Sequence, residues 1–167
     1  MVACGYEVPA SLQPPVMRLH STYALITEPT ERSGALGTGC IVWESARPYT
    51  YMRQVDNRVV IGGMDIPFRS DAIRDRLVPD RTRRLERELK RLLPECDTLT
   101  SYSWAGTFAE TRDGMPIIGP VPGAPNVYFA LGYGGNGVTF SVVAANILRD
   151  LCLGVPNDNT RVFRPDR

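Results

Sequence analysis

The sequence feature that most constrains the fold is a stretch rich in glycine and proline between Thr111 and Thr139. It contains one short apolar segment, Val127 to Leu131, which predicts a buried strand. The stretch ends in the letters GYGGNG, residues 132–137, directly before an apolar run from Val138 to Leu153. A glycine loop that enters a helix exposes backbone N–H groups and the positive end of the helix dipole. Such a place suits a phosphate, a carboxylate or the electron-rich edge of a cofactor ring.

Two helices are predicted. The run from Val138 to Leu153 is apolar on nearly every side and precedes Gly154, which predicts a largely buried helix that ends at that glycine. The second helix is predicted over Arg81 to Leu93, where leucines recur at helical spacing. Asp80 is its expected N-cap, and Pro94 stops the run.

Strands are predicted from β-rich segments with turn residues between them. Asp56-Asn57 forms an expected two-residue turn, because both residue types tolerate positive φ. Alternation places Tyr49, Tyr51 and Arg53 on one face of this hairpin, and Thr50 and Met52 on the other. The predicted strands are 1–8 (a short tail), 21–28, 40–43, 49–55, 58–63, 99–108 and 127–131; segments 9–20, 29–38 and 64–79 are expected to be irregular or looped, and 155–167 a loosely held tail.

The expected fold class is therefore α+β. It has a mostly antiparallel sheet with the 81–93 helix packed on it, together with the buried C-terminal helix.

Charge and hydropathy argue against several functional classes. The net charge is +1, so no general nucleic-acid field is implied. The arginines of the 81–93 helix are interpreted as a solvated face, since Glu86 and Lys90 form a favourable i,i+4 pair. No apolar run reaches the ~20 residues that a membrane span needs. The first residues, MVACGYEVPA, lack the pattern of a signal peptide, so a cytoplasmic location is the default expectation. Nothing in the sequence addresses the oligomeric state.

The cysteines at 4, 40, 96 and 152 lie far apart, and His20 is the single histidine. Zinc sites need clustered ligands, so no metal site is expected. The cysteines are interpreted as small, mostly buried hydrophobic residues. His20 is expected to be an exposed or structural side chain, and no catalytic residue is assigned.

Several motifs together carry a resemblance to a known family. They are Trp104-Ala105-Gly106, then TRDGMPIIG (111–119) and PNVYFALGYGGNGVTFS (125–141), with WESARPYTYMRQVDNRVVIGGMD (43–65) and ACGYE (3–7) upstream. This series resembles the C-terminal part of FAD-dependent amine and amino-acid oxidoreductases, the D-amino-acid oxidase, glycine oxidase and sarcosine oxidase superfamily. The resemblance covers essentially the whole chain in the expected order.

The resemblance implies a division of the chain. Residues 1–8 would be a remnant strand of the FAD-binding domain, 9–110 the substrate-binding domain, 111–154 a flavin-contacting segment with the C-terminal helix, and 155–167 a tail. The family opens with a strand, a GxGxxG turn and a helix that hold the FAD pyrophosphate. No such Rossmann unit is recognised here. The chain is therefore expected to be the C-terminal portion of a larger flavoenzyme, to retain FAD poorly and to be inactive without the missing N-terminal FAD-binding segment.

By resemblance, two segments would lie against FAD. The expected cofactor-binding residues are Asp113, Gly114, Pro116, Gly132, Gly134, Gly135, Asn136, Gly137, Val138 and Thr139. The alternative is that the glycines only form a tight turn from strand to helix. A third interpretation, an independent phosphate site, lacks the GK[ST] ending of a P-loop.

The hairpin would form the wall over the reactive face of the flavin. Tyr49 falls where glycine oxidase-like members place a substrate-contacting tyrosine. Tyr51, Arg53, Asp65 and Phe108 complete the expected substrate residues, although the tyrosines could be ordinary sheet aromatics, Arg53 a structural ion-pairing residue and Asp65 an exposed loop residue.

Departures from the family pattern bear on the substrate. Glycine oxidase-like members place carboxylate-clamping arginines where this chain has Phe108 and Gly135. Since a bidentate arginine is the natural partner of a carboxylate, the hypothesis favours an amine or a larger substrate over a small amino acid. The hairpin looks closer to the gamma-glutamylputrescine oxidase branch. The competing hypothesis is a non-catalytic, cap-like binding module without its own flavin.

Overall fold

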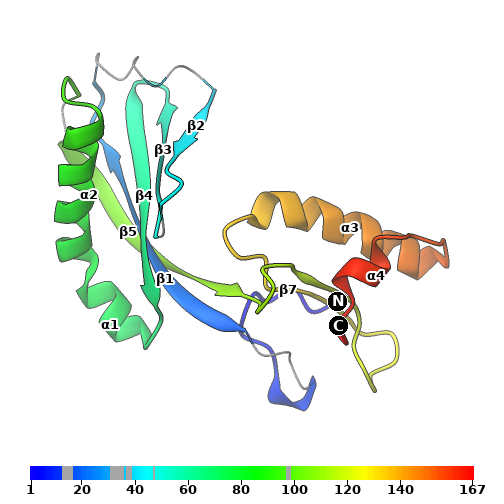
Figure 1. The fold of residues 1–167 in the computed structure, drawn as a ribbon. Coiled ribbons are helices and arrows are strands. Elements are labelled where there is room, and N and C mark those ends of the chain that lie inside the picture. Colours follow the sequence, from blue (N-terminus) through cyan, green and yellow to red (C-terminus); the bar gives the residue numbers. More distant parts are fainter. Residues whose placement is uncertain (13–16, 31–35, 37–38, 47, 97–98) are drawn as a thin grey trace. The chain divides into compact units, whose positions relative to one another are not determined.

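The computed structural model describes residues 1–12, 17–30, 36, 39–46, 48–96 and 99–167. The chain divides into two compact units, residues 21–107 and residues 1–20 with 108–167. Figure 1 shows their elements in chain order. Most of the predicted loop over 29–38 lies outside the described residues.

The first unit is built on a five-stranded sheet in the order β2-β3-β4-β1-β5. The printed registers of β2 with β3 and of β3 with β4 are antiparallel. The mostly antiparallel, α+β prediction is thus confirmed. The strands are β1 (Arg18–Thr27), β2 (Ile41–Trp43), β3 (Thr50–Val55), β4 (Arg58–Pro67) and β5 (Thr100–Glu110).

The β3–β4 hairpin has the predicted register. Asp56 adopts φ 53° in its turn, and Tyr51 lies opposite Gly62. Met52 and Thr50 are buried, whereas Arg53 on the other face is exposed. The predicted alternation of the hairpin side chains is therefore confirmed for β3.

Helix α2 (Val78–Leu92) packs against this sheet, and the preceding α1 (Asp71–Arg76) is joined to β5 by a hydrogen bond from Arg74 to the Thr107 hydroxyl. Leu85 and Leu89 of α2 are fully buried with Tyr23, Val59 and Ile61 of the strands. The leucine spacing therefore places one apolar stripe of α2 on the sheet.

Three local predictions in this region are wrong. Residues 64–79 are not a loop, because β4 continues to Pro67 and Ser70 caps α1 by accepting a hydrogen bond from the N–H of Ile73. Asp80 is not the N-cap of α2, since the helix already begins at Val78 with Leu77 in the cap position.

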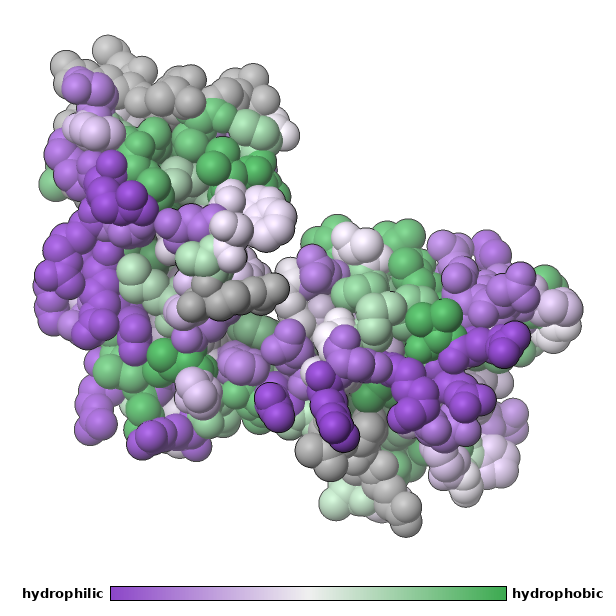
Figure 2. All heavy atoms as spheres, in the orientation of Figure 1, coloured by the Kyte–Doolittle hydropathy of each residue, from purple (hydrophilic) through white to green (hydrophobic). Residues whose placement is uncertain are grey.

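The expected Glu86–Lys90 pair does not form either. The Glu86 carboxylate instead accepts a hydrogen bond from Thr100 at 2.6 Å, and the Lys90 ammonium donates to the carbonyl of Pro94 at 2.7 Å. Glu86 is thus bonded to the first residue of β5, and Lys90 to a residue just after α2. The outer surface of α2 is nonetheless strongly hydrophilic, as Figure 2 shows.

The second unit contains a two-stranded antiparallel sheet and two helices. Ile118, Ala130, Ala144, Ile147 and Phe163 form one buried cluster between them. Near the N-terminus, Val2 forms an isolated parallel bridge to Phe129, which is less than the predicted strand over 1–8. The elements are η1 (Ala10–Leu12), β6 (Ile117–Pro120), β7 (Tyr128–Leu131), α3 (Gly137–Leu153) and α4 (Thr160–Phe163).

Helix α3 begins and ends as expected, with Gly154 in the left-handed conformation at its C-terminus. The expectation of burial on nearly every side is wrong. Val138 and Val142 are 84% and 60% exposed, and Ala145 on the same helical stripe is also exposed. The part of the chain that the structure describes therefore packs against only one face of α3.

The C-terminal tail is held more firmly than predicted. Phe163 is buried, Pro165 lies against Gly119, and Arg167 pairs with Asp113. The prediction of mostly buried cysteines is also wrong, because only Cys96 is buried and the other three are exposed. Among the described residues, no helix combines the length and apolarity that a membrane span requires, and no cluster of three metal-ligating side chains occurs.

Candidate functional site

The glycine loop connects β7 to α3, and its backbone conformation requires glycine at specific positions. Gly132 has φ 70° and Gly134 has φ 55°, a backbone region that residues with a Cβ rarely adopt. A Cβ on Gly132 would also stand 2.8 Å from Cγ2 of Thr111 and 3.2 Å from Sδ of Met17. Both conformation and space therefore require glycine at this position. The N–H of Gly134 donates to the carbonyl of Ala109 at 2.9 Å, which fixes the loop to β5.

The start of α3 leaves its backbone donors available. The Asn136 side chain makes no capping hydrogen bond. No acceptor among the described residues faces the N–H groups of Gly137, Val138 and Thr139. A Cβ at Gly137 would meet no atom within 4 Å, so this end of the 17-residue helix is open. Three free donors and the positive end of the dipole can hold an electron-rich group here.

The second predicted cofactor segment, around Asp113, forms a tightly bonded turn. Asp113 Oδ1 accepts hydrogen bonds from the Thr111 hydroxyl at 3.0 Å and from the N–H of Met115 at 3.1 Å. Arg167 donates to both carboxylate oxygens, at 2.8 and 3.1 Å. These contacts, with Arg167 foremost, hold the pKa of Asp113 well below its usual range. The carboxylate is thus committed to the turn, with Gly114 at φ 71° and Pro116 buried beside it.

Phe108 lies in the same unit as the glycine loop and stacks on His20, with ring centroids 5.3 Å apart. The His20 Nε2 atom lies 3.6 Å from a carboxylate oxygen of Glu110. Glu110 in turn forms an isolated bridge with Tyr133 of the loop. His20 is therefore part of β1 and not of an irregular crossover, and it forms an aromatic and charged cluster that the sequence patterns did not indicate.

The other predicted substrate residues lie in the unit of residues 21–107. Rings of Trp43, Tyr49 and Tyr51 form a row, with centroids 6.3 and 6.2 Å apart. Trp43 is 68% exposed and was missed by sequence reasoning, although its register opposite Tyr51 on the edge strand would have identified it. A Cβ on Gly62 would come within 2.5 Å of the Tyr51 hydroxyl, so this glycine makes room for the ring.

The Tyr51 hydroxyl has a raised pKa. Burial, then the Asp65 carboxylate and the Tyr49 ring hydroxyl, raise the pKa of Tyr51. Arg53 is exposed on the same face of β3. The structure thus gathers Tyr49, Tyr51, Arg53 and Asp65 in one unit.

The predicted cofactor residues from Asp113 to Thr139, together with Phe108, belong to the other unit. Within it, the spacing G-x-G-x-x-G does occur, at Gly132, Gly134 and Gly137. The residues that the structure describes nonetheless form no dinucleotide-binding unit around this spacing. Strand β7 pairs antiparallel with β6, and no strand follows α3 in the described residues. The spacing alone is therefore no pyrophosphate site.

Comparison with known proteins identifies one family, and the similar proteins found are oxidoreductases. The sequence profile of the DAO family, described as FAD dependent oxidoreductase, matches residues 1–151. A glycine oxidase from Bacillus licheniformis is 34% identical over 73 residues, which covers 43% of this chain and 20% of that protein. A probable oxidoreductase, OrdL, from Haemophilus influenzae is 26% identical over 138 residues, which covers 80% of this chain and 29% of the relative.

A solved structure shares the fold. Glycine oxidase from Geobacillus kaustophilus superposes with a TM-score of 0.72 at 18% identity, covering 90% of this chain and 40% of the other. The chain thus spans well under half the length of each of these relatives.

Proposed function

The chain belongs to the DAO family of FAD dependent oxidoreductases, and we propose that it supplies the substrate-binding sheet and the flavin-contacting loop of an enzyme that oxidises the C–N bond of an amine or amino acid. The observation that carries the proposal is the open start of α3. Three unpaired N–H groups, at Gly137, Val138 and Thr139, point out of a helix end that has no side-chain cap.

These residues fit the polar edge of a flavin ring. The ring edge carries hydrogen-bond acceptors and gains electron density on reduction, which favours backbone donors and a positive dipole. Gly137 leaves the space in front of the donors open, so a ring can approach the backbone. The residues that would hold FAD are Gly132, Gly134, Gly135, Asn136, Gly137, Val138 and Thr139. A bound flavin would supply the hydride acceptor for oxidation of the carbon next to the substrate nitrogen.

We assign a supporting part to Asp113. Its carboxylate already accepts hydrogen bonds from Thr111, Met115 and Arg167. Asp113 therefore shapes the 111–116 turn, and its carboxylate is not available to bind the cofactor directly. Gly114 and Pro116 belong to this same turn. In the proposed enzyme the turn would present backbone groups to FAD, whereas its side chains hold the turn in place.

The pyrophosphate of FAD would be held by a segment other than these 167 residues. The support is the exposed apolar stripe of α3, formed by Val138, Val142 and Ala145. Such a stripe on a helix is usually covered by another element, and an FAD-binding segment would cover it. The chain alone is accordingly proposed to be inactive and to retain little FAD.

The proposed substrate is an amine or a larger amino compound. Phe108 stacks on His20 and offers no guanidinium, and Gly135 offers none in the loop. A small amino acid would therefore lack its bidentate partner at both family positions. The Trp43, Tyr49 and Tyr51 rings can instead contact the carbon chain of a substrate and attract an ammonium group. Placing an arginine at 108 (Phe108→Arg) should raise kcat/KM for glycine relative to amines at least tenfold.

The test joins this chain to any dinucleotide-binding segment encoded upstream at its locus. Amine-dependent reduction of bound flavin, measured by loss of the flavin absorbance under anaerobic conditions, is the expected result. Turnover of glycine at rates equal to those of amines would contradict the substrate class. A joined protein that binds amines without reducing flavin would instead identify a cap-like binding module.

A further inference from the structure

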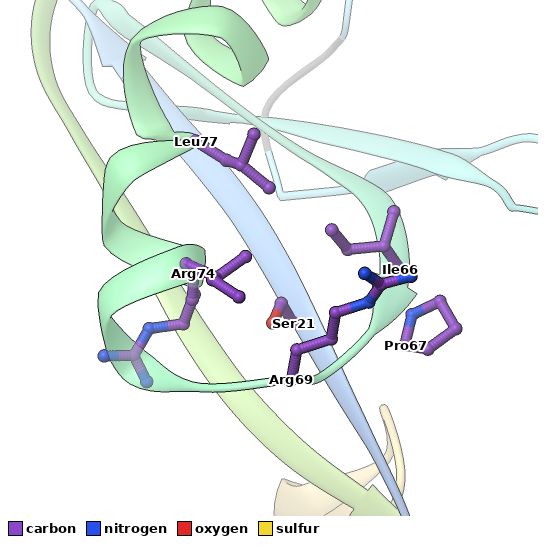
Figure 3. Close-up of a pocket in the computed structure, with 7 residues that line it drawn as sticks. Ser21, Ile66, Pro67, Arg69, Arg74 and Leu77 are labelled. Atoms are coloured by element: carbon purple, nitrogen blue, oxygen red, sulfur yellow. The ribbon is translucent and has the colours of Figure 1, made fainter.

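A cavity of about 340 Å³ lies in the unit of residues 21–107, between β1, the end of β4 and α1. Its walls are mainly apolar. Ile66 and Pro67 come from β4, Ile73 from α1, and Leu77 from the residue that joins α1 to α2. Figure 3 shows Ile66, Pro67 and Leu77 around a common space. The cavity is large enough for a small organic ligand.

The two arginines that line this cavity differ in their partners. Arg74 is engaged, since it contacts Asp71 and Asp75 at 2.8 Å each and donates to the Thr107 hydroxyl at 2.8 Å. Among the described residues, no ion pair or side-chain hydrogen bond involves Arg69. Figure 3 shows the Arg69 guanidinium beside Ile66 and Pro67, whereas that of Arg74 points away from them. One uncompensated cation therefore stands at an apolar cavity.

The floor of the cavity adds one polar group. Ser21 on β1 is 2% exposed and lines the cavity with its side chain. A hydroxyl can donate to an anion or accept from a protonated group, so it does not by itself set the charge of a ligand. Arg69 does set it. A cationic ligand would be repelled by this guanidinium, although solvent screens part of the repulsion because Arg69 is exposed.

We propose that this cavity binds a small amphiphilic carboxylate, with its carboxylate on Arg69 and its carbon chain against Ile66, Ile73 and Leu77. A guanidinium pairs bidentately with one carboxylate, which neutralises the single free charge. Burial of a carbon chain against the apolar walls stabilises the complex in proportion to the apolar area buried. A phosphate dianion fits less well, because a single free cation leaves one of its charges uncompensated. This inference does not depend on flavin binding.

The experiment is a titration of the 167-residue chain with sodium hexanoate, followed by NMR of isotopically labelled isoleucine and leucine methyl groups. Acetate has the same charge without the chain, and hexylammonium has the chain with the opposite charge. We expect saturable shifts of the Ile66, Ile73 and Leu77 methyls with hexanoate. Acetate and hexylammonium should bind at least tenfold more weakly at the same ionic strength.

A matched pair of variants tests the role of the charge. Arg69→Gln should weaken hexanoate binding at least tenfold. Arg87→Gln removes the same charge from an exposed position of α2 and should change it less than twofold. Both positions are exposed, so both variants should fold. Equal binding of hexanoate and hexylammonium, an equal effect of the two variants, or no saturable shift at these methyls would overturn the proposal.

Discussion

The ion pair between Arg167 and Asp113 ties the last residue of the chain to the turn next to the glycine loop. Arg167 donates to both Asp113 oxygens and also to the carbonyl of Arg164 at 3.0 Å. The Arg167 side chain is 19% exposed, but that of Asp113 is 50% exposed, so solvent screens the pair. After that discount, Arg167→Gln should destabilise the docked tail by about 1–2 kcal/mol.

This loss can be read at a single amide. The N–H of Phe163, which is buried with α4, donates to the carbonyl of Asn159. A loss of that size corresponds to a roughly 5–30-fold greater population of the open tail. Hydrogen exchange of the Phe163 amide, measured by NMR, should accelerate by this factor in Arg167→Gln. Arg161→Gln removes an exposed arginine of α4, the helix that carries Phe163, for which the described residues supply no ion pair; it is the matched control and should change the rate less than twofold.

The effect should depend on pH in a defined direction. Because Arg167 lowers the pKa of Asp113 in the folded state, the stabilisation is complete above the ordinary aspartate pKa of about 4. It declines as the pH falls below that value toward the folded-state pKa. The difference between Arg167→Gln and the unaltered chain should therefore shrink between pH 5 and pH 2. Equal exchange in the two variants, or a difference that stays constant to pH 2, would refute the reasoning.

Four glycine substitutions test other parts of the account. Gly132→Ala places a Cβ 2.8 Å from Thr111 at φ 70° and should lower the free energy of unfolding by about 2–4 kcal/mol, measured by thermal unfolding. Gly154→Ala has a similar φ of 67° but no atom near the added Cβ, so it should lower the free energy of unfolding by only about 1 kcal/mol. Gly62→Ala should cost about 1–2 kcal/mol by displacing Tyr51, and the cost should vanish in a Tyr51→Ala background; persistence there would contradict the packing argument. Gly137→Ala should stabilise the chain by about 0.5 kcal/mol, since nothing lies near its Cβ, yet it should lower FAD affinity at least tenfold in the joined enzyme; unchanged affinity would remove this position from the cofactor site.

Local patterns predicted the sheet strands and the long helices well. The leucine spacing of α2, the Asp56 turn and the Gly154 helix end each depend on residues close in sequence, so short-range physics determines them. Helix α1 and strand β6 were missed because they are short and weakly periodic. Ser70, which caps α1, was the available signal.

The errors at the site have a common cause, which is long-range pairing. Asp113 meets Arg167 across 54 positions in the sequence, and His20 meets Phe108 and Glu110 across about 90. No spacing rule links such residues. The expected burial of α3 was wrong for a related reason, since apolarity indicates that a helix needs a cover but not whether this chain supplies it.

The central claim is that this chain caps a flavin whose pyrophosphate is held by another segment. The most direct measurement is the flavin released per chain on denaturation, after purification with added FAD, for the 167 residues alone and for the chain joined to an upstream dinucleotide-binding segment. The account predicts a colourless chain alone and about one flavin per joined chain. Stoichiometric flavin in the chain alone, or none in the joined protein, would contradict it.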